Sequence, residues 1–166
     1  MATVSANTHS QDIYLGTLVY ATDATGVKPV NQGDIAVWDA TLNGGNGAVR
    51  AAAAQADMAA YAGAATQSSF LNSLKEIEPT VAVAFKNVYM FKTTAAEVYK
   101  TGTKVFFLET ADAQTITSST NAGARTVAVG YVVLPNESLV AGSVTGAAGV
   151  SVPVAVTANF PVASLA

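Results

Sequence analysis

The stretch TVAVAFKNVYMFKT, from Thr80 to Thr93, holds two short runs of β-branched and aromatic residues on either side of Lys86 and Asn87. Residues of these types favour extended structure, and a run of about four to eight of them predicts a β-strand. We therefore predict strands over residues 80–85 and 88–93. Whether the whole fold is mainly β depends on how often this pattern recurs.

The pattern recurs along the chain, with Gly, Asn and Asp between the runs. Further strands are predicted over residues 13–21, 34–39, 104–110, 114–117, 126–134 and 150–158. Alternation within residues 34–39 places Ile35 and Val37 on the opposite face from Trp38. Pro153 predicts an edge strand or a bulge in the last run, because proline lacks the N–H that a sheet ladder uses. Short strands at this spacing predict a mainly β fold, a small sandwich or barrel.

One segment predicts a helix instead. In SSFLNSLKEIEP, apolar residues recur at helical spacing between a serine cap and Pro79, so a short inserted helix is predicted over about residues 68–78. Residues 51–65 are ambiguous: alanine favours a helix, but Gly63 and the lack of large residues at helical spacing do not. Residues 1–12 are polar and aperiodic, and they predict a flexible N-terminal arm before a single β-rich domain, residues 13–166.

The composition is unusually poor in charge. Charged residues make up 11% of the chain, where about 25% is usual, and hydrophobic residues make up 51%. A surface with so few charges indicates that copies or partners cover much of it. The net charge of −3 without a basic cluster argues against nucleic-acid binding. No apolar run reaches the ~18 residues of a membrane span, and no secretory signal is visible, so a soluble protein is expected.

The C-terminal part is the poorest in charge. From Thr126 onward, Glu137 is the only charged side chain. Frequent Gly, Ser, Thr, Asn and Pro residues exclude a membrane span there. The segment is either a pair of strands buried on both faces or a stretch that lies against a neighbouring subunit.

The glycine cluster in DATLNGGNGAVR, residues 39–50, invites three binding-loop interpretations, and each fails. A dinucleotide loop needs a third glycine where Arg50 stands, and a P-loop needs a lysine that is absent. An EF-hand counted from Asp39 needs a carboxylate at its twelfth position, which is again Arg50. We therefore predict a loop between β segments, in which Asn-Gly pairs supply positive φ, and no cofactor or metal site.

No catalytic constellation is visible either. The only histidine, His9, lies in the predicted arm. Asp34 and Asp39 are five residues apart, so a strand would place them on opposite faces, each flanking a turn. There is no G-x-S-x-G elbow, no S-x-x-K and no cysteine. The strand aromatics are expected in the core: Tyr14, Tyr20, Tyr89, Phe91, Phe106, Phe107 and Tyr131. An enzyme is not expected.

The order of segments resembles a known family. The segments are Gly33-Asp34-Ile35-Ala36-Val37, VYMFKTTAAE (88–97), TGTKVFFLETADAQTIT (101–117), AVGYVV (128–133) and VPVAV (152–156). Together they resemble the small β-rich head decoration (capsid cement) proteins of tailed bacteriophages. Two features depart from that pattern: the predicted helix is an insertion, and Thr103 replaces the aspartate of the second glycine-led strand.

The resemblance implies a non-enzymatic virion protein, made in the host cytoplasm and bound to the outer surface of the capsid. It implies no cofactor, and as partners the major capsid protein and further copies of the chain, with a trimer favoured. Candidate contact residues are Thr3, Val4, His9, Gln11, Asp12, Trp38, Asn43, Asn46 and Phe160. Two alternatives remain open: another phage structural part, such as a tail or fibre domain, and a carbohydrate-binding β-sandwich with Trp38 as its exposed platform.

Overall fold

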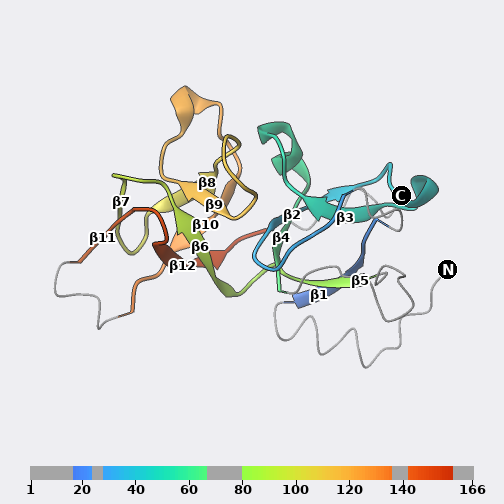
Figure 1. Ribbon diagram of the computed structural model, residues 1–166, viewed down its shortest axis with the longest axis horizontal. Coiled ribbons are helices and arrows are strands. Elements are labelled where there is room, and N and C mark those ends of the chain that lie inside the picture. Colours follow the sequence, from blue (N-terminus) through green and yellow to red (C-terminus); the bar gives the residue numbers. More distant parts are fainter. Residues whose placement is uncertain (1–16, 24–27, 67–79, 136–141, 159–166) are drawn as a thin grey trace.

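A computed structural model of the chain describes residues 17–23, 28–66, 80–135 and 142–158. Its strands form two five-stranded sheets, an open one and a closed barrel, which lie side by side in Figure 1. The predicted mainly β fold is confirmed. The helix predicted over residues 68–78 and the arm predicted over residues 1–12 lie outside the described residues.

The first sheet, here called the sheet half, contains five antiparallel strands in the order β1-β5-β4-β2-β3. Its strands are β1 (Thr17–Ala21), β2 (Ile35–Asp39), β3 (Ala48–Ala51), β4 (Tyr61–Ala65) and β5 (Thr80–Ala84). The two edge strands approach each other, because Thr22, directly after β1, forms an isolated bridge with Val49 of β3. The sheet therefore curls toward closure.

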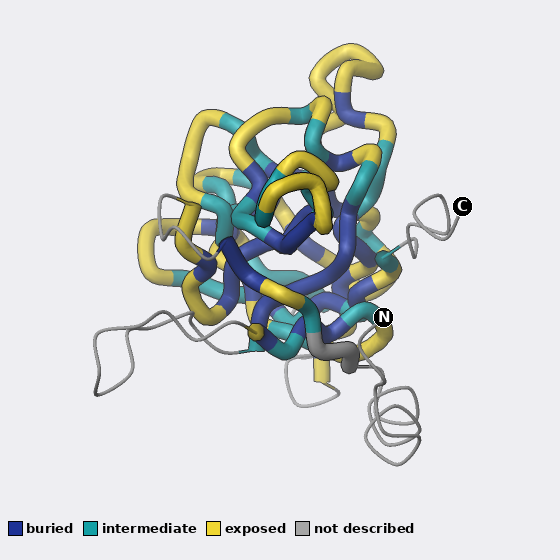
Figure 2. The backbone as a smooth tube through the Cα atoms, turned by 90° about the vertical axis from the view of Figure 1, so that its right-hand side faces the viewer, coloured by how far each residue is buried: buried dark blue, intermediate teal, exposed yellow. Residues whose placement is uncertain are grey.

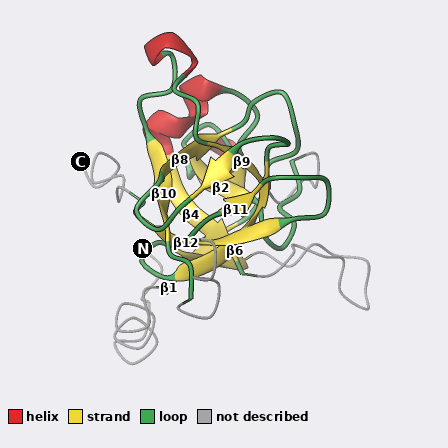
Figure 3. Cartoon of the chain, turned by 90° about the vertical axis from the view of Figure 1, so that its left-hand side faces the viewer, coloured by secondary structure: helices red, strands yellow, loops and turns green. Residues whose placement is uncertain are grey.

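The second sheet, here called the barrel half, closes in the order β10-β12-β6-β9-β8. Its strands are β6 (Val88–Thr93), β8 (Lys104–Phe107), β9 (Thr115–Thr117), β10 (Ala128–Val132) and β12 (Ser151–Val156). Only the β6–β9 pair among them is parallel. A small ribbon of β7 (Val98–Tyr99) and β11 (Val144–Thr145) accompanies the barrel. Figure 3 views the molecule from the barrel side.

The predicted strands match the observed ones, with shorter ends. The strand predicted over residues 104–110 ends at Phe107, because Leu108 and the residues after it enter a turn. The sequence did not predict β3, β4, β7 and β11 as strands. Two of these, β7 and β11, have only two residues each, which is too short for any periodic signal.

The ambiguous alanine-rich segment contains neither one long helix nor one long strand. After β3 the chain forms a 3₁₀ helix, η2 (Gln55–Ala60), and then β4. Every residue of β4 is buried, and the four residues after Tyr61 have small side chains that fit between packed layers. A bulge shifts the β2–β4 register at Gly63, whose φ is +139°. A Cβ atom at Gly63 would lie 2.2 Å from the carbonyl oxygen of Ala84, so only glycine permits this close approach.

The buried residues form two hydrophobic clusters, of which the larger holds the halves together. The larger one joins barrel residues such as Phe91 and Phe107 to Ile35 and Val37 of β2. The smaller one lies on the other face of the sheet half and consists of alanine and valine: Val30, Ala36, Val49, Ala62, Ala65, Val81 and Val83. Trp38 packs against the smaller cluster, so the predicted alternation in β2 is confirmed. Figure 2, which looks onto the sheet half, shows buried segments at the centre and exposed loops around them.

Hydrogen bonds also cross between the halves. The buried hydroxyl of Tyr61 donates to the carbonyl oxygen of Val129 at 3.1 Å. The side-chain amide of Gln55 donates to the carbonyl oxygen of Phe107 at 2.8 Å. Because buried polar groups must be paired, these contacts fix the orientation of one half on the other.

The prediction for Pro153 is wrong. β12 is paired on both sides, with β10 and β6, and its register with β6 is continuous through Pro153. The proline carbonyl accepts from the N–H of Val133, which is one residue beyond the end of β10. The missing proline N–H would point toward the same neighbour, where the ladder ends. A closed barrel therefore accommodates this proline without an edge or a bulge.

The two glycine-led turns have the same geometry. The Asp34 carboxylate accepts from the N–H of Asn31 at 2.7 Å, and the Asp34 N–H donates to the Asn31 carbonyl. In the second turn the Thr103 hydroxyl accepts from the N–H of Lys100 at 2.9 Å, and the Thr103 N–H donates to the Lys100 carbonyl. Threonine thus supplies the acceptor that aspartate supplies in the first turn.

Candidate interaction surface

Three neighbouring barrel strands carry a group of apolar side chains on their outer surface. We call this surface the apolar face and define it by six residues: Val88 and Met90 of β6, Pro153 and Ala155 of β12, and Tyr131 and Val133 at the end of β10. In the cross-strand register Val88 is opposite Ala155, which is opposite Tyr131. Met90 is opposite Pro153, whose carbonyl accepts from Val133. The six residues therefore form two adjacent rows across three strands.

Strand alternation explains why these side chains face outward. Phe91 of β6 and Val152 and Val154 of β12 are fully buried, and they alternate with the residues of the apolar face. Successive side chains of a strand point to opposite sides, so burying one set in the barrel exposes the other. The sequence places apolar residues in both sets.

The apolar face is exposed to an unusual degree for large hydrophobic residues. The exposed fractions are 53% for Val88, 54% for Met90, 43% for Tyr131 and 40% for Val133. Among the described residues, the one other large hydrophobic residue with comparable exposure is Val98, at 50%, on the separate β7–β11 ribbon. Contiguous exposed apolar side chains, as opposed to scattered ones, are typical of a protein–protein contact surface.

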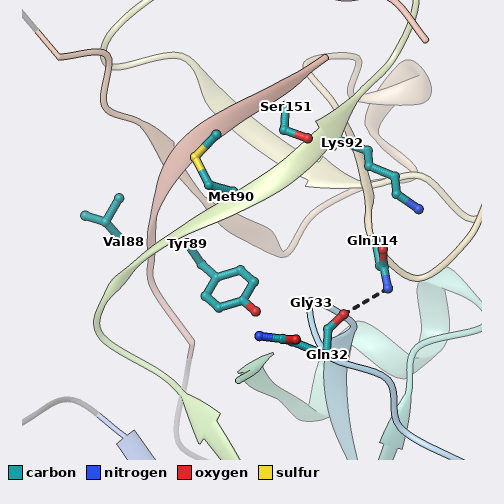
Figure 4. Close-up of a pocket in the computed structure, with 8 residues that line it drawn as sticks. All are labelled: Gln32, Gly33, Val88, Tyr89, Met90, Lys92, Gln114 and Ser151. Atoms are coloured by element: carbon teal, nitrogen blue, oxygen red, sulfur yellow. Dashed lines mark hydrogen bonds between the residues drawn. The ribbon is translucent and has the colours of Figure 1, made fainter. Parts of the chain in front are cut away.

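The apolar face continues into a groove between the two halves, the junction groove, with a volume of about 490 Å³. Its lining consists of Gln32, Gly33, Val88, Tyr89, Met90, Lys92, Gln114 and Ser151. In Figure 4, Tyr89 points toward Gln32, whereas Val88 and Met90 point away from it. The side-chain amide of Gln114 donates to the carbonyl oxygen of Gln32 at 3.0 Å and closes one end of the groove.

The groove contains no nucleophile–base pair among the described residues. Ser151 and Lys92 are cross-strand partners, the arrangement that a serine–lysine hydrolase would need. However, the Lys92 ammonium donates to the carboxylate of Asp112, and no hydrogen bond joins it to Ser151. Nucleophilic catalysis requires the base within hydrogen-bond reach of the nucleophile. Ser151 and Lys92 are therefore not arranged for this chemistry.

Every carboxylate in the described residues accepts a hydrogen bond from the chain itself. These carboxylates belong to Asp23, Asp34, Asp39, Asp57, Glu97, Glu109 and Asp112. Glu97 is held most tightly, by Thr117, Ser118 and the hydroxyl of Tyr99. Burial alone would raise the pKa of Glu97, but these hydrogen bonds outweigh burial and lower the pKa. Such a carboxylate is a structural acceptor and a weak base.

Arg50, which excluded two loop motifs in the sequence, joins two carboxylates of the sheet half. Its guanidinium contacts Asp39 at 2.8 Å and Asp57 at 2.7 Å. Hydrogen bonds from Arg50 lower the pKa of Asp57 to about 2 despite partial burial. Hydrogen bonds from Thr41 and then Arg50 lower the pKa of Asp39. Because Asp57 also accepts from two backbone N–H groups, this cluster anchors the start of η2 to the β2–β3 hairpin.

The glycine cluster is the loop of that hairpin, as predicted. It contains a 3₁₀ turn, η1 (Asn43–Gly45), and positive φ at Asn43, Gly44, Gly45 and Gly47. The loop packs on Trp38, since a Cβ atom at Gly47 would lie 2.2 Å from a carbon of the Trp38 ring. Asp34 and Asp39 each accept a backbone N–H of an adjacent turn, also as predicted.

Three of the candidate contact residues lie in the described chain, and all three are on or next to this hairpin. Trp38 is half-buried against the smaller cluster, and its indole nitrogen is buried without a hydrogen-bond partner. The side-chain amide of Asn43 donates to the Thr22 carbonyl, and that of Asn46 to the Asn43 carbonyl. None of the three belongs to the apolar face. The other candidates lie outside the described residues: Thr3, Val4, His9, Gln11, Asp12 and Phe160.

The strand aromatics divide between core and surface. Phe91, Phe106 and Phe107 are buried, as predicted, and Tyr20 and Tyr89 are partly buried. Tyr131 is exposed, against the prediction, because the β10 side chains that alternate with it fill the barrel. Tyr14 lies outside the described residues.

The apolar face was not predicted from the sequence, although the sequence contains a signal for it. In VYMFKT both alternating sets are rich in apolar residues, so the sequence cannot say which set faces solvent. The scarcity of charge after Thr126 was the better indicator, because two of the three strands that carry the face come from that segment.

No group of three or more His, Cys, Asp or Glu side chains in the described part of the chain could hold a metal ion. None of the helices found there is both long and apolar enough to cross a membrane.

Comparison with known proteins adds no relative: no protein family, no curated protein and no solved structure matches this chain.

Proposed function

We propose that this chain is a non-enzymatic structural protein of a phage virion, which decorates the outside of the capsid and binds the major capsid protein through the apolar face. The observation that carries the proposal is the contiguous exposure of large apolar side chains on three adjacent strands. A fully solvated monomer gains nothing from such a surface, whereas a protein seated on a lattice buries it.

Three further features support this function. The segment order resembles that of capsid cement proteins, and the chain is poor in charge. The described carboxylates are engaged in structural hydrogen bonds, and the junction groove lacks a nucleophile–base pair. Weak contacts repeated over many lattice positions stabilise a shell even when each one is modest.

The carbohydrate-binding alternative lacks the exposed aromatic platform that it requires. It required Trp38 as an exposed platform, but the indole packs against Gly47 and the smaller cluster. A tail or fibre component would use the same apolar face, and only its location in the virion separates it from a capsid protein. Electron microscopy of virions that carry a labelled copy of this chain distinguishes head from tail.

The direct test is co-sedimentation of the purified full chain with expanded, undecorated capsids of the parent virus. We expect saturable binding by the wild-type chain and a loss of affinity of about tenfold or more in Met90→Glu, because a charge replaces a side chain that the contact would bury. Val98→Glu is the matched control, since Val98 is equally exposed but lies on the β7–β11 ribbon.

Two outcomes contradict the proposal. If the wild-type chain does not sediment with capsids, the function is wrong. If Met90→Glu binds as tightly as the wild type, or Val98→Glu loses as much affinity as Met90→Glu, the apolar face is not the contact surface. Thermal unfolding of each variant checks that it is folded.

A further inference from the structure

The apolar face is edged by lysines that the chain leaves without a counter-charge. In the described residues, Lys28, Arg50, Lys92 and Arg125 each contact a carboxylate. Lys86, Lys100 and Lys104 are exposed, and no ion pair involves them in that part of the chain. The unpaired cations of the described residues therefore all belong to the barrel half or to the turns that enter its strands.

Two of these lysines lie at opposite edges of the face. Lys104 is opposite Tyr131 in the β8–β10 ladder, with its ammonium 5.5 Å from the centre of the Phe106 ring. Lys86 lies in the turn two residues before Val88. Hydrogen bonds from Val156 and Ala158 hold that turn against the end of β12.

The third lysine lies beside Val133. Lys100 begins the turn that leads into β8, and the next residue, Thr101, accepts from the N–H of Leu134 through its hydroxyl. The following residue, Gly102, donates its N–H to the carbonyl oxygen of Val132. The turn is thus attached on both sides of Val133, at the end of the face opposite the Lys86 turn.

We propose that the partner of the apolar face is a protein surface that presents an apolar strip edged by carboxylates. This inference rests on the proposed function and adds the chemistry of the partner. Burying the apolar rows brings the three ammonium groups close to the partner, and opposite charges there raise the association rate and select the partner. A neutral or basic surface would leave the lysines facing no counter-charge.

The described residues favour a different protein over a second copy of this chain as the partner. Two copies stacked face to face would oppose lysine to lysine, because a two-fold contact uses the same patch on both subunits. A head-to-tail contact would need carboxylates on the opposing surface, and those of the described residues already accept hydrogen bonds within the chain. The proposed partner is therefore a different protein surface, which for a decoration protein is the capsid lattice, and the test below includes self-association as an outcome.

The test measures capsid co-sedimentation at about 0.1 M and about 1 M salt, over which the Debye length falls from about 10 Å to about 3 Å. We expect high salt to weaken wild-type binding. A triple variant, Lys86→Glu with Lys100→Glu and Lys104→Glu, should lose about tenfold in affinity at low salt and be insensitive to, or strengthened by, high salt. The matched variant with arginine at the same three positions should behave like the wild type.

Each outcome has one meaning. No wild-type binding at either salt concentration overturns the proposed function. Wild-type binding that the glutamate triple variant shares, with the same salt dependence, leaves the function intact and overturns the acidic partner. Sedimentation of the free chain is measured in parallel. Self-association that Met90→Glu abolishes would assign the face to a second copy and also overturn the inference.

Discussion

The two halves of the molecule are built from strands of similar length but from side chains of different size. The sheet half encloses a cluster made of alanine and valine, whereas the barrel half is filled by phenylalanine, isoleucine and valine. Small side chains let strands approach closely, as at the β4 bulge, and large ones fill the wider interior of a closed barrel. The buried alanines of the described chain thus all lie in the sheet half and the segment after β3.

The surfaces of the halves differ as well. Every large hydrophobic residue that is exposed in the described chain lies on the barrel half or on its β7–β11 ribbon. Lys28 and Arg50 of the sheet half contact carboxylates, whereas the exposed Lys86 lies in the turn that leads from β5 into the barrel half. The cations on the strands of the sheet half are therefore neutralised within the chain. The barrel half instead presents exposed apolar side chains and unpaired lysines. We propose that both halves contribute to stability and that the barrel half carries the binding surface.

The largest expected effect comes from the interior of the barrel half. Phe91→Ala should lower the free energy of unfolding by about 3–5 kcal/mol, because a fully buried ring leaves a cavity. Val83→Ala in the smaller cluster should cost only about 2 kcal/mol, since it removes two buried methyl groups. Urea unfolding followed by fluorescence compares the two. Equal losses in the free energy of unfolding would contradict the expected difference between the two clusters.

The hairpin of the sheet half allows a sharper comparison within one loop. Gly47→Ala should cost about 2–4 kcal/mol, because a Cβ atom there collides with the Trp38 ring and the residue has φ of +80°. Gly44→Ala has the same kind of backbone but open space around it, and should cost only about 1 kcal/mol. Thermal unfolding measures both. If Gly44→Ala is as harmful as Gly47→Ala, contact with Trp38 is not what constrains the loop.

The contact between the halves is tested at Tyr61, with Tyr20 of the sheet half as the comparison. Tyr61→Phe should cost about 1 kcal/mol, because it removes a buried hydrogen bond to the Val129 carbonyl, which then accepts only from the N–H of Thr157. Tyr20→Phe should be neutral or slightly stabilising, because the Tyr20 hydroxyl is buried without a partner. Chemical unfolding of the two variants gives the difference. A Tyr20→Phe variant that loses as much stability as Tyr61→Phe would contradict the assignment.

The smallest effect concerns acid stability. The folded-state pKa of Asp57 is about 2, below the usual 3.8, so this carboxylate stabilises the fold above about pH 4 and loses its contribution as pH falls toward 2. Asp57→Asn should therefore lower the melting temperature near neutral pH and converge with the wild type in acid. The loss in Asp112→Asn should be smaller, because its ion pair with Lys92 is half exposed to solvent. If the difference in melting temperature between Asp57→Asn and the wild type is the same at all pH values, the lowered pKa of Asp57 does not stabilise the fold.

The sequence predicted the mainly β fold and most strands, because β-branched and aromatic runs between turn residues encode extended structure locally. The alternation of β2, the turn roles of Asp34 and Asp39, and the glycine loop of the hairpin were likewise local properties. The β4 strand escaped prediction because its alanines carry no periodic signal, and its burial comes from layers distant in the chain. Pro153 was misjudged because barrel closure, which decides whether a strand has an edge, is not local.

The stretch TVAVAFKNVYMFKT shows which properties the local sequence determines and which depend on the tertiary structure. Its residue types by themselves determine two strands, since each run favours extended backbone whatever surrounds it. Only the tertiary structure decides that these strands, although consecutive, part into the sheet half and the barrel half. It also decides that Phe91 fills the barrel while Val88 and Met90 face outward, because two apolar faces of one strand are distinguished only by what packs against them.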